Sequence, residues 1–161
     1  MDHLIATLLT GIGATLIIDL WALLRRGLFG TALPNHALVG RWVGHMASGR
    51  FQHDSMARVA PIAGERWIGW ALHYASGVAF AGILSGIGGP AWMQRPTVGL
   101  ALVVGIATVA APFLLVQPGM GAGVAASRTP RPGAARMQSL VTHAVFGLGL
   151  FLAAWVVSGA L

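Results

Sequence analysis

The stretch Trp67–Ile87, which reads WIGWALHYASGVAFAGILSGI, decides the fold. It contains no charged side chain, and as a helix rising about 1.5 Å per residue it would cross the roughly 30 Å hydrocarbon core of a bilayer. Small and polar residues recur at every fourth position along it: Gly69, His73, Gly77, Ala81 and Ser85. Because small residues let membrane helices approach closely, this row predicts the face on which the helix packs.

The rest of the chain is equally apolar. Of its 161 residues, 56% are hydrophobic and only 9% charged, with a mean hydropathy of +0.75. A soluble domain carries about 25% charged residues, so the composition indicates a membrane protein. Three further stretches are long enough to span a bilayer: Leu4–Leu24, Thr97–Gln117 and Gln138–Ala160. We therefore predict an all-α fold in one domain, a four-transmembrane-helix bundle with a long interfacial loop at residues 27–66.

The arginines predict the orientation. All ten basic residues are arginines; six lie between the first and second spans, one between the second and third, and three between the third and fourth. By the positive-inside rule, the first and third connections are cytoplasmic and both termini lie outside, as expected for a bacterial inner membrane protein. Nucleic-acid binding is excluded because the arginines separate apolar spans instead of gathering on a soluble face. The start, Met1-Asp2-His3, has no basic segment, so we expect the first helix to be retained.

Cysteine is absent, which excludes disulfides and thiolate metal sites. The polar chemistry is instead concentrated in residues 40–74. Leu38, Trp42 and Met46 recur at helical spacing and predict a short helix lying in the membrane interface. Two similar units follow each other here, each ending in a histidine: Gly40-Arg41-Trp42 with His45, and Gly49-Arg50-Phe51 with His53.

Several smaller features carry local predictions. The glycine run 119–123 follows a membrane helix and not a strand, so we interpret it as a flexible loop touching lipid headgroups instead of a nucleotide site. The candidate headgroup contacts are Arg41, Arg50, Arg128 and Arg131. We expect Pro112 to kink the third span, Gly88-Gly89-Pro90 to end the second, Asp54 and Arg58 to form an i, i+4 pair, and His3 and His36 to be solvated.

Three spans bring an ionisable group to a similar depth. Asp19, His73 and His143 each lie about 10 Å inside the expected cytoplasmic end of a different helix, and Gln117 lies slightly nearer the surface. Placing such a group in a bilayer costs about 3 kcal/mol on insertion scales, so these groups are expected to face a shared cavity. The loop could cover it with Glu65, His45 and His53. This set suits a divalent transition metal, and it equally suits a protonatable small ligand or a proton relay.

Other interpretations stay open. A single polar side chain in a membrane helix is often only a bond between helices, worth about 0.6 kcal/mol. His45 and His53 also fit an ordinary surface helix. The small-residue rows, including Gly77 and Ala81, could dock on a second copy of the chain or on a larger membrane complex, making the protein an accessory subunit. A membrane enzyme using a histidine and a carboxylate for acid–base work ranks last, since no nucleophile motif is present.

A set of short motifs resembles a known family. These motifs are Gly11-Ile12-Gly13-Ala14-Thr15 with Asp19-Leu20-Trp21, Gly40-Arg41-Trp42 with Gly44-His45, Gly49-Arg50-Phe51 with His53, Gly69-Trp70 with His73-Tyr74, Pro112-Phe113 with Gln117-Pro118 and Gly121-Ala122-Gly123, and His143 with Phe146-Gly147. Over nearly the whole chain they resemble the bacterial domain-of-unknown-function 2938 family. The resemblance implies a small four-helix inner-membrane protein and implies no activity.

Overall fold

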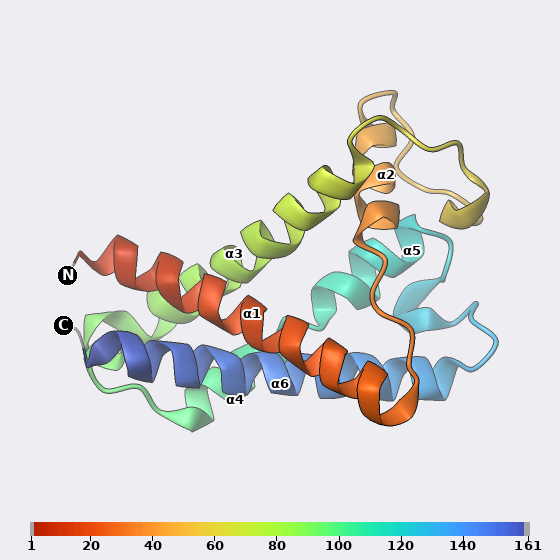
Figure 1. The fold of residues 1–161 in the computed structure, drawn as a ribbon. Helices are drawn as coiled ribbons and strands as arrows, with labels where there is room; N and C mark the ends of the chain where they lie inside the picture. Colours follow the sequence, from red (N-terminus) through yellow and green to blue (C-terminus); the bar gives the residue numbers. More distant parts are fainter. Residues whose placement is uncertain (1, 160–161) are drawn as a thin grey trace. The chain divides into compact units, whose positions relative to one another are not determined.

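The computed structural model describes residues 2–159, and in that range the chain is helical without strands (Figure 1). The elements are α1 (His3–Phe29), α2 (His36–Met46), η1 (Met56–Arg58), α3 (Glu65–Gln94), α4 (Val98–Ala107), η2 (Pro112–Val116), α5 (Gln117–Gly119), η3 (Val124–Ala126) and α6 (Pro132–Ser158). Four stretches are long and apolar enough to cross a membrane: His3–Phe29, Glu65–Gln94, Val98–Gly119 and Pro132–Ser158. The four predicted spans and the short helix in the loop are thus confirmed as helices.

Helices α1 and α6 extend beyond the bounds that the apolar pattern indicated. Helix α1 continues past Leu24 to Phe29, where Gly30 takes the left-handed conformation (φ 64°) that commonly ends a helix. Helix α6 begins at Pro132, before the predicted Gln138, because proline suits the first helical position, where no backbone N–H is needed. The predicted last residue of this span, 160, lies outside the described residues.

The two predicted breaks behave differently. Gly89 interrupts α3 with φ 66° and ψ −177°, but helical structure resumes through Pro90 to Gln94, so the predicted end of the span is a kink. Pro112 opens a π-helical turn, η2, which confirms the predicted irregularity in the third span. Because proline has no backbone N–H and its ring clashes with the preceding turn, the normal helical pattern cannot continue through it.

The chain divides into two compact units. Unit 1 contains residues 2–33, 74–108 and 141–159, and unit 2 contains residues 34–73 and 109–140. Helices α3 and α6 each contribute one part to both units. Within unit 1, the start of α1 and the end of α6 lie at the same end, as an even number of spans requires (Figure 1).

Glycines bring the helices of unit 1 into backbone contact. A Cβ atom on Gly11 of α1 would lie 2.9 Å from the Gly77 carbonyl oxygen of α3, and one on Gly147 of α6 would lie 2.9 Å from the Ala101 carbonyl oxygen of α4. Real Cβ atoms do not approach backbone this closely, so only glycine fits at these crossings. The core around them combines small and aliphatic residues with Met93 and the aromatic rings of Trp92 and Phe146.

The small-residue row of α3 faces this interior. Gly77 packs against Thr15 and the Gly11 carbonyl of α1, Ala81 is 2% exposed, and Ser85 is 5% exposed. Ser85 also contacts the ring of His3 at 2.7 Å, so His3 is exposed as expected but is bonded to the buried row. The hypothesis that Gly77 and Ala81 form an outward docking surface is therefore wrong, because this face is already used inside unit 1.

Candidate functional site

The crossing of α2 and α3 in unit 2 also depends on a glycine pair. A Cβ atom on Gly40 would overlap the Glu65 carbonyl oxygen and lie 2.7 Å from the Gly69 nitrogen. One on Gly69 would overlap the His36 carbonyl oxygen and lie 3.3 Å from the Ala37 nitrogen. The two backbones are therefore in contact. Side chains that lie one helical turn from these glycines are brought close together.

The side chains brought together are two imidazoles. His36 lies four residues before Gly40 in α2, and His73 lies four residues after Gly69 in α3. Their rings stack with centroids 4.3 Å apart and planes 29° apart, and one nitrogen of each lies within 4.8 Å of the other. Trp70 packs against both, at 4.5 Å from the His36 ring and 5.7 Å from the His73 ring.

The prediction that His36 is solvated is therefore wrong, and His36 is the site residue that sequence reasoning missed. A signal was present in the chain. The spacing from His36 to Gly40 mirrors that from Gly69 to His73, so two helices crossing at the two glycines necessarily bring both imidazoles near the crossing. The sequence alone does not say that these two helices cross.

Asp19 of α1 is hydrogen-bonded to Tyr74 of α3. Within unit 1, the Tyr74 hydroxyl donates a hydrogen bond to Asp19 Oδ2 at 2.9 Å. Asp19 and Tyr74 are both half-buried. A carboxylate oriented by an outer hydroxyl donor is a common arrangement around metal ligands, because the donor fixes which oxygen lone pairs remain available.

His143 takes part in a hydrogen-bonded link between two helices of unit 1. The Thr108 hydroxyl at the end of α4 donates to the Gly105 carbonyl at 2.6 Å, and its oxygen lies 2.8 Å from His143 Nδ1. Since a threonine hydroxyl has one hydrogen, His143 Nδ1 must carry the proton and donate to Thr108. This is the bond between helices that the sequence left open as an alternative for an intramembrane histidine.

Gln117 has a similar local role in unit 2. Its amide nitrogen donates to the Ser139 hydroxyl at 3.5 Å, while its Oε1 is buried and has no hydrogen-bond partner among residues 2–159. Gln117 therefore joins η2–α5 to the start of α6.

Glu65 is committed to Arg41. The carboxylate of Glu65 accepts two bonds from the guanidinium of Arg41, each 2.8 Å long, and a third from the Ile62 backbone at 3.1 Å. Arg41 also donates to the carbonyls of Val59 at 2.8 Å and Met56 at 3.4 Å. The hydrogen bond to Glu65 raises the pKa of the Arg41 guanidinium, so the pair stays ionised. Glu65 is thus a structural anchor for the loop instead of a free ligand, and Arg41 is not free for lipid headgroups.

The two loop histidines are neighbours. The rings of His45 and His53 meet edge to face with centroids 5.6 Å apart. His45 Nε2 lies 3.1 Å from the Ala60 carbonyl, which can only accept, so this nitrogen donates. Nε2 of His53 is buried and lacks a hydrogen-bond partner in the described part of the chain. Both histidines remain candidates, with His45 already held by the loop backbone.

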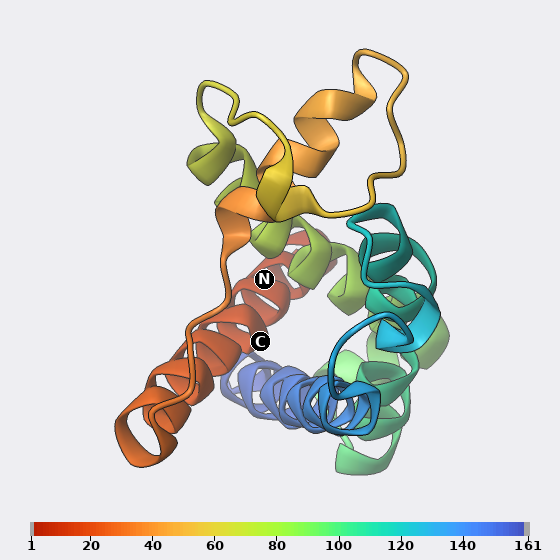
Figure 2. The same ribbon diagram turned by 90° about the vertical axis from the view of Figure 1, so that its right-hand side faces the viewer.

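The glycine run 119–123 packs against a neighbouring segment. Gly119 lies against the Trp42 ring, its carbonyl accepts a 2.9 Å bond from the His53 backbone, and Gly121 (φ 94°) lies against the Asp54 backbone. Figure 2 shows the connection after α2 passing beside this segment within unit 2. The glycines of this run therefore permit close backbone contact.

The family follows from a comparison with known proteins. The chain matches the family described as Protein of unknown function (DUF2938) over residues 8–157. It belongs to this family. No curated protein and no solved structure matches the chain significantly. The predicted resemblance is confirmed, and the family brings no activity to the residues described above.

Proposed function

We propose that the protein binds a divalent transition metal ion through His36 and His73. The observation that supports it most is the pair of stacked imidazoles beside a glycine-paired helix crossing. Imidazole is a good ligand for Zn, Fe, Ni and Cu, and without cysteine the site offers no thiolate to favour softer ions.

The geometry of the pair suits this chemistry. At Zn–N distances of about 2.0–2.1 Å, two nitrogens on one tetrahedral ion lie about 3.3 Å apart. The two ring nitrogens already lie within 4.8 Å, so a modest ring rotation would suffice. Trp70 covers one side of the pair with an apolar surface, which limits access by water and strengthens the metal–ligand interaction.

Two histidines fill only part of the coordination sphere of a metal ion and leave positions open, as expected of a site that exchanges ligands or hands a metal on. We therefore favour metal handling or transport over a closed structural site.

The orientation completes the proposal. Nine arginines lie in the first and third connections or in the helix ends beside them, and one lies in the second connection, which supports a multi-pass protein of the cytoplasmic membrane with both termini outside. The described ends of α1 and α6 lie at one end of unit 1, consistent with this arrangement.

Elemental analysis of the purified protein tests the metal site. After loading with Zn²⁺ and gel filtration in a nonionic detergent, we expect about one metal ion per chain. His36→Ala and His73→Ala should each lose most of it, because each removes a ligand.

The matched control is His143→Ala, which removes a half-buried imidazole held by Thr108 and should keep the metal. Circular dichroism would verify that all variants stay helical. Negligible metal in the wild type, or equal metal in the wild type and both site variants, would exclude the proposal.

A further inference from the structure

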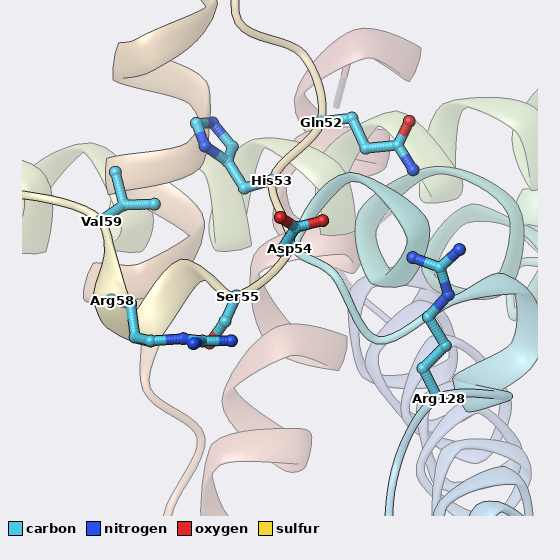
Figure 3. Close-up of a pocket in the computed structure, with 7 residues that line it drawn as sticks. All are labelled: Gln52, His53, Asp54, Ser55, Arg58, Val59 and Arg128. Carbon is cyan, nitrogen blue, oxygen red and sulfur yellow. The ribbon is translucent and has the colours of Figure 1, made fainter.

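A second cluster of polar groups surrounds a cavity in unit 2. The cavity has a volume of about 720 Å³, within the range of small-molecule sites. Figure 3 shows the seven residues that line it: Gln52, His53, Asp54, Ser55, Arg58, Val59 and Arg128. All but Arg128 come from one loop segment, and Arg128 comes from the turn after η3.

We propose that this cavity binds a phosphate group, carried by a free phosphorylated molecule or by a lipid headgroup. Two guanidiniums, from Arg58 and Arg128, contribute to its lining, and Asp54 is the acidic residue there. No hydrogen bond or ion pair joins any of these three side chains to another described residue, so the predicted Asp54–Arg58 pair is wrong. With two positive charges and one negative, the lining carries a formal charge of 2 − 1 = +1.

The residue types favour phosphate over other anions. Guanidinium groups offer planar pairs of N–H donors that match phosphate oxygens, and the Ser55 hydroxyl and Gln52 amide can donate as well. Asp54 opposes a fully ionised ligand but can accept a hydrogen bond from the P–OH of a singly protonated phosphate. The carboxylate therefore selects against higher negative charge and keeps the expected affinity moderate.

The turn that presents Arg128 is built at a conformational cost. Ala125 and Ala126 have φ angles of 47° and 58°, in the left-handed region that side chains other than glycine rarely adopt. The turn is held by Arg136 Nε, which donates to the Ala125 carbonyl at 2.8 Å, and by the Arg128 backbone N–H, which donates to the Ala122 carbonyl at 2.8 Å. Maintained strain of this kind concentrates where a side chain must be positioned for binding.

Titration with inorganic phosphate tests the inference. The full chain in a nonionic maltoside detergent and 0.15 M NaCl should broaden the phosphorus NMR signal saturably. We expect Arg58→Gln and Arg128→Gln each to weaken binding about tenfold, since each removes charge-assisted hydrogen bonds. Asp54→Asn should instead strengthen binding about fivefold by removing a repulsive charge. Arg95→Gln, which changes an exposed arginine of unit 1 outside the lining, is the matched control and should bind like the wild type.

Short-chain phosphatidylglycerol, titrated in parallel, separates the two sources of phosphate. Binding of inorganic phosphate identifies a free ligand, and binding of the lipid alone identifies a headgroup; both support the site if the arginine variants lose it. The proposal is overturned if neither probe binds, if Arg95→Gln weakens binding as much as Arg128→Gln, or if Asp54→Asn weakens it. Because Asp54→Asn is expected to raise affinity, misfolding cannot imitate the full set of results.

Discussion

Replacing Gly69 by alanine is expected to lower both the free energy of unfolding and the metal affinity, although alanine is the better helix former by about 1 kcal/mol. The new Cβ would overlap the His36 carbonyl oxygen, so α2 must move away from α3. We expect a loss of about 1–3 kcal/mol in the free energy of unfolding, typical of overpacking, and metal affinity about 10- to 100-fold weaker, since the two imidazoles separate. Thermal unfolding and metal titration measure the two effects.

Gly82→Ala is the matched control in the same helix. A Cβ atom there has nothing within 4 Å, so this variant should unfold at or slightly above the wild-type temperature and keep its metal. If Gly69→Ala behaves like Gly82→Ala in both measurements, the close crossing of α2 and α3 does not exist as described.

Replacing Arg41 by alanine is expected to release the loop between α2 and α3. The side chains of Arg41 and Glu65 are only 11% and 17% exposed, so the change leaves a carboxylate and the Val59 and Met56 carbonyls without their donor. Hydrogen exchange of the Ile62 and Met56 amides should accelerate at least about tenfold, because charge-assisted hydrogen bonds that hold this segment are lost. Mass spectrometry of exchanged peptides measures this directly.

The double variant Arg41→Met with Glu65→Met sharpens this test. Removing both partners leaves no uncompensated charge, so the Met56 amide should exchange more slowly than in Arg41→Ala despite the two changes. The comparison uses Met56 because the Ile62 amide loses its acceptor when Glu65 is replaced. Arg50→Ala, an exposed arginine in the same connection, should leave exchange unchanged. Equal exchange in Arg41→Ala and Arg50→Ala would show that the ion pair does not organise the loop.

The elements of the fold were predictable because they depend on local pattern. Hydropathy and length located all four spans, helical spacing of Leu38, Trp42 and Met46 located α2, and Pro112 marked the irregular turn. Helix ends were less predictable. Helix α6 starts at Pro132, because a proline that breaks a helix interior is favourable at its first position.

The candidate site was only half predictable, since it depends on which helices touch. His73 stands out as an ionisable group in an apolar span, whereas His36 is the first residue of the short helix α2 and lies outside the apolar spans. The same depth argument selected His143 and Gln117, whose partners, Thr108 and Ser139, are common residues without a spacing signal. Depth in the membrane restricts where a side chain lies along one axis and leaves its neighbours undetermined.

The contacts of the glycines show which helices pack against the small-residue row of α3. The row through Gly69 and Gly77 correctly identifies the packing face of α3 but leaves open whether its partners lie in the same chain or in another. The contacts of Gly69 and Gly77 with α2 and α1 instead occupy this face within the chain. A small-residue row predicts that a helix packs closely, and only the tertiary structure says against what.

X-ray absorption at the zinc edge, on protein loaded with one equivalent of Zn²⁺, tests directly whether His36 and His73 both bind the metal ion. We expect nitrogen and oxygen ligands at about 2.0–2.1 Å with the scattering signature of two imidazoles, falling to one imidazole in His36→Ala. A wild-type spectrum without imidazole scattering, or one that His36→Ala leaves unchanged, would contradict it.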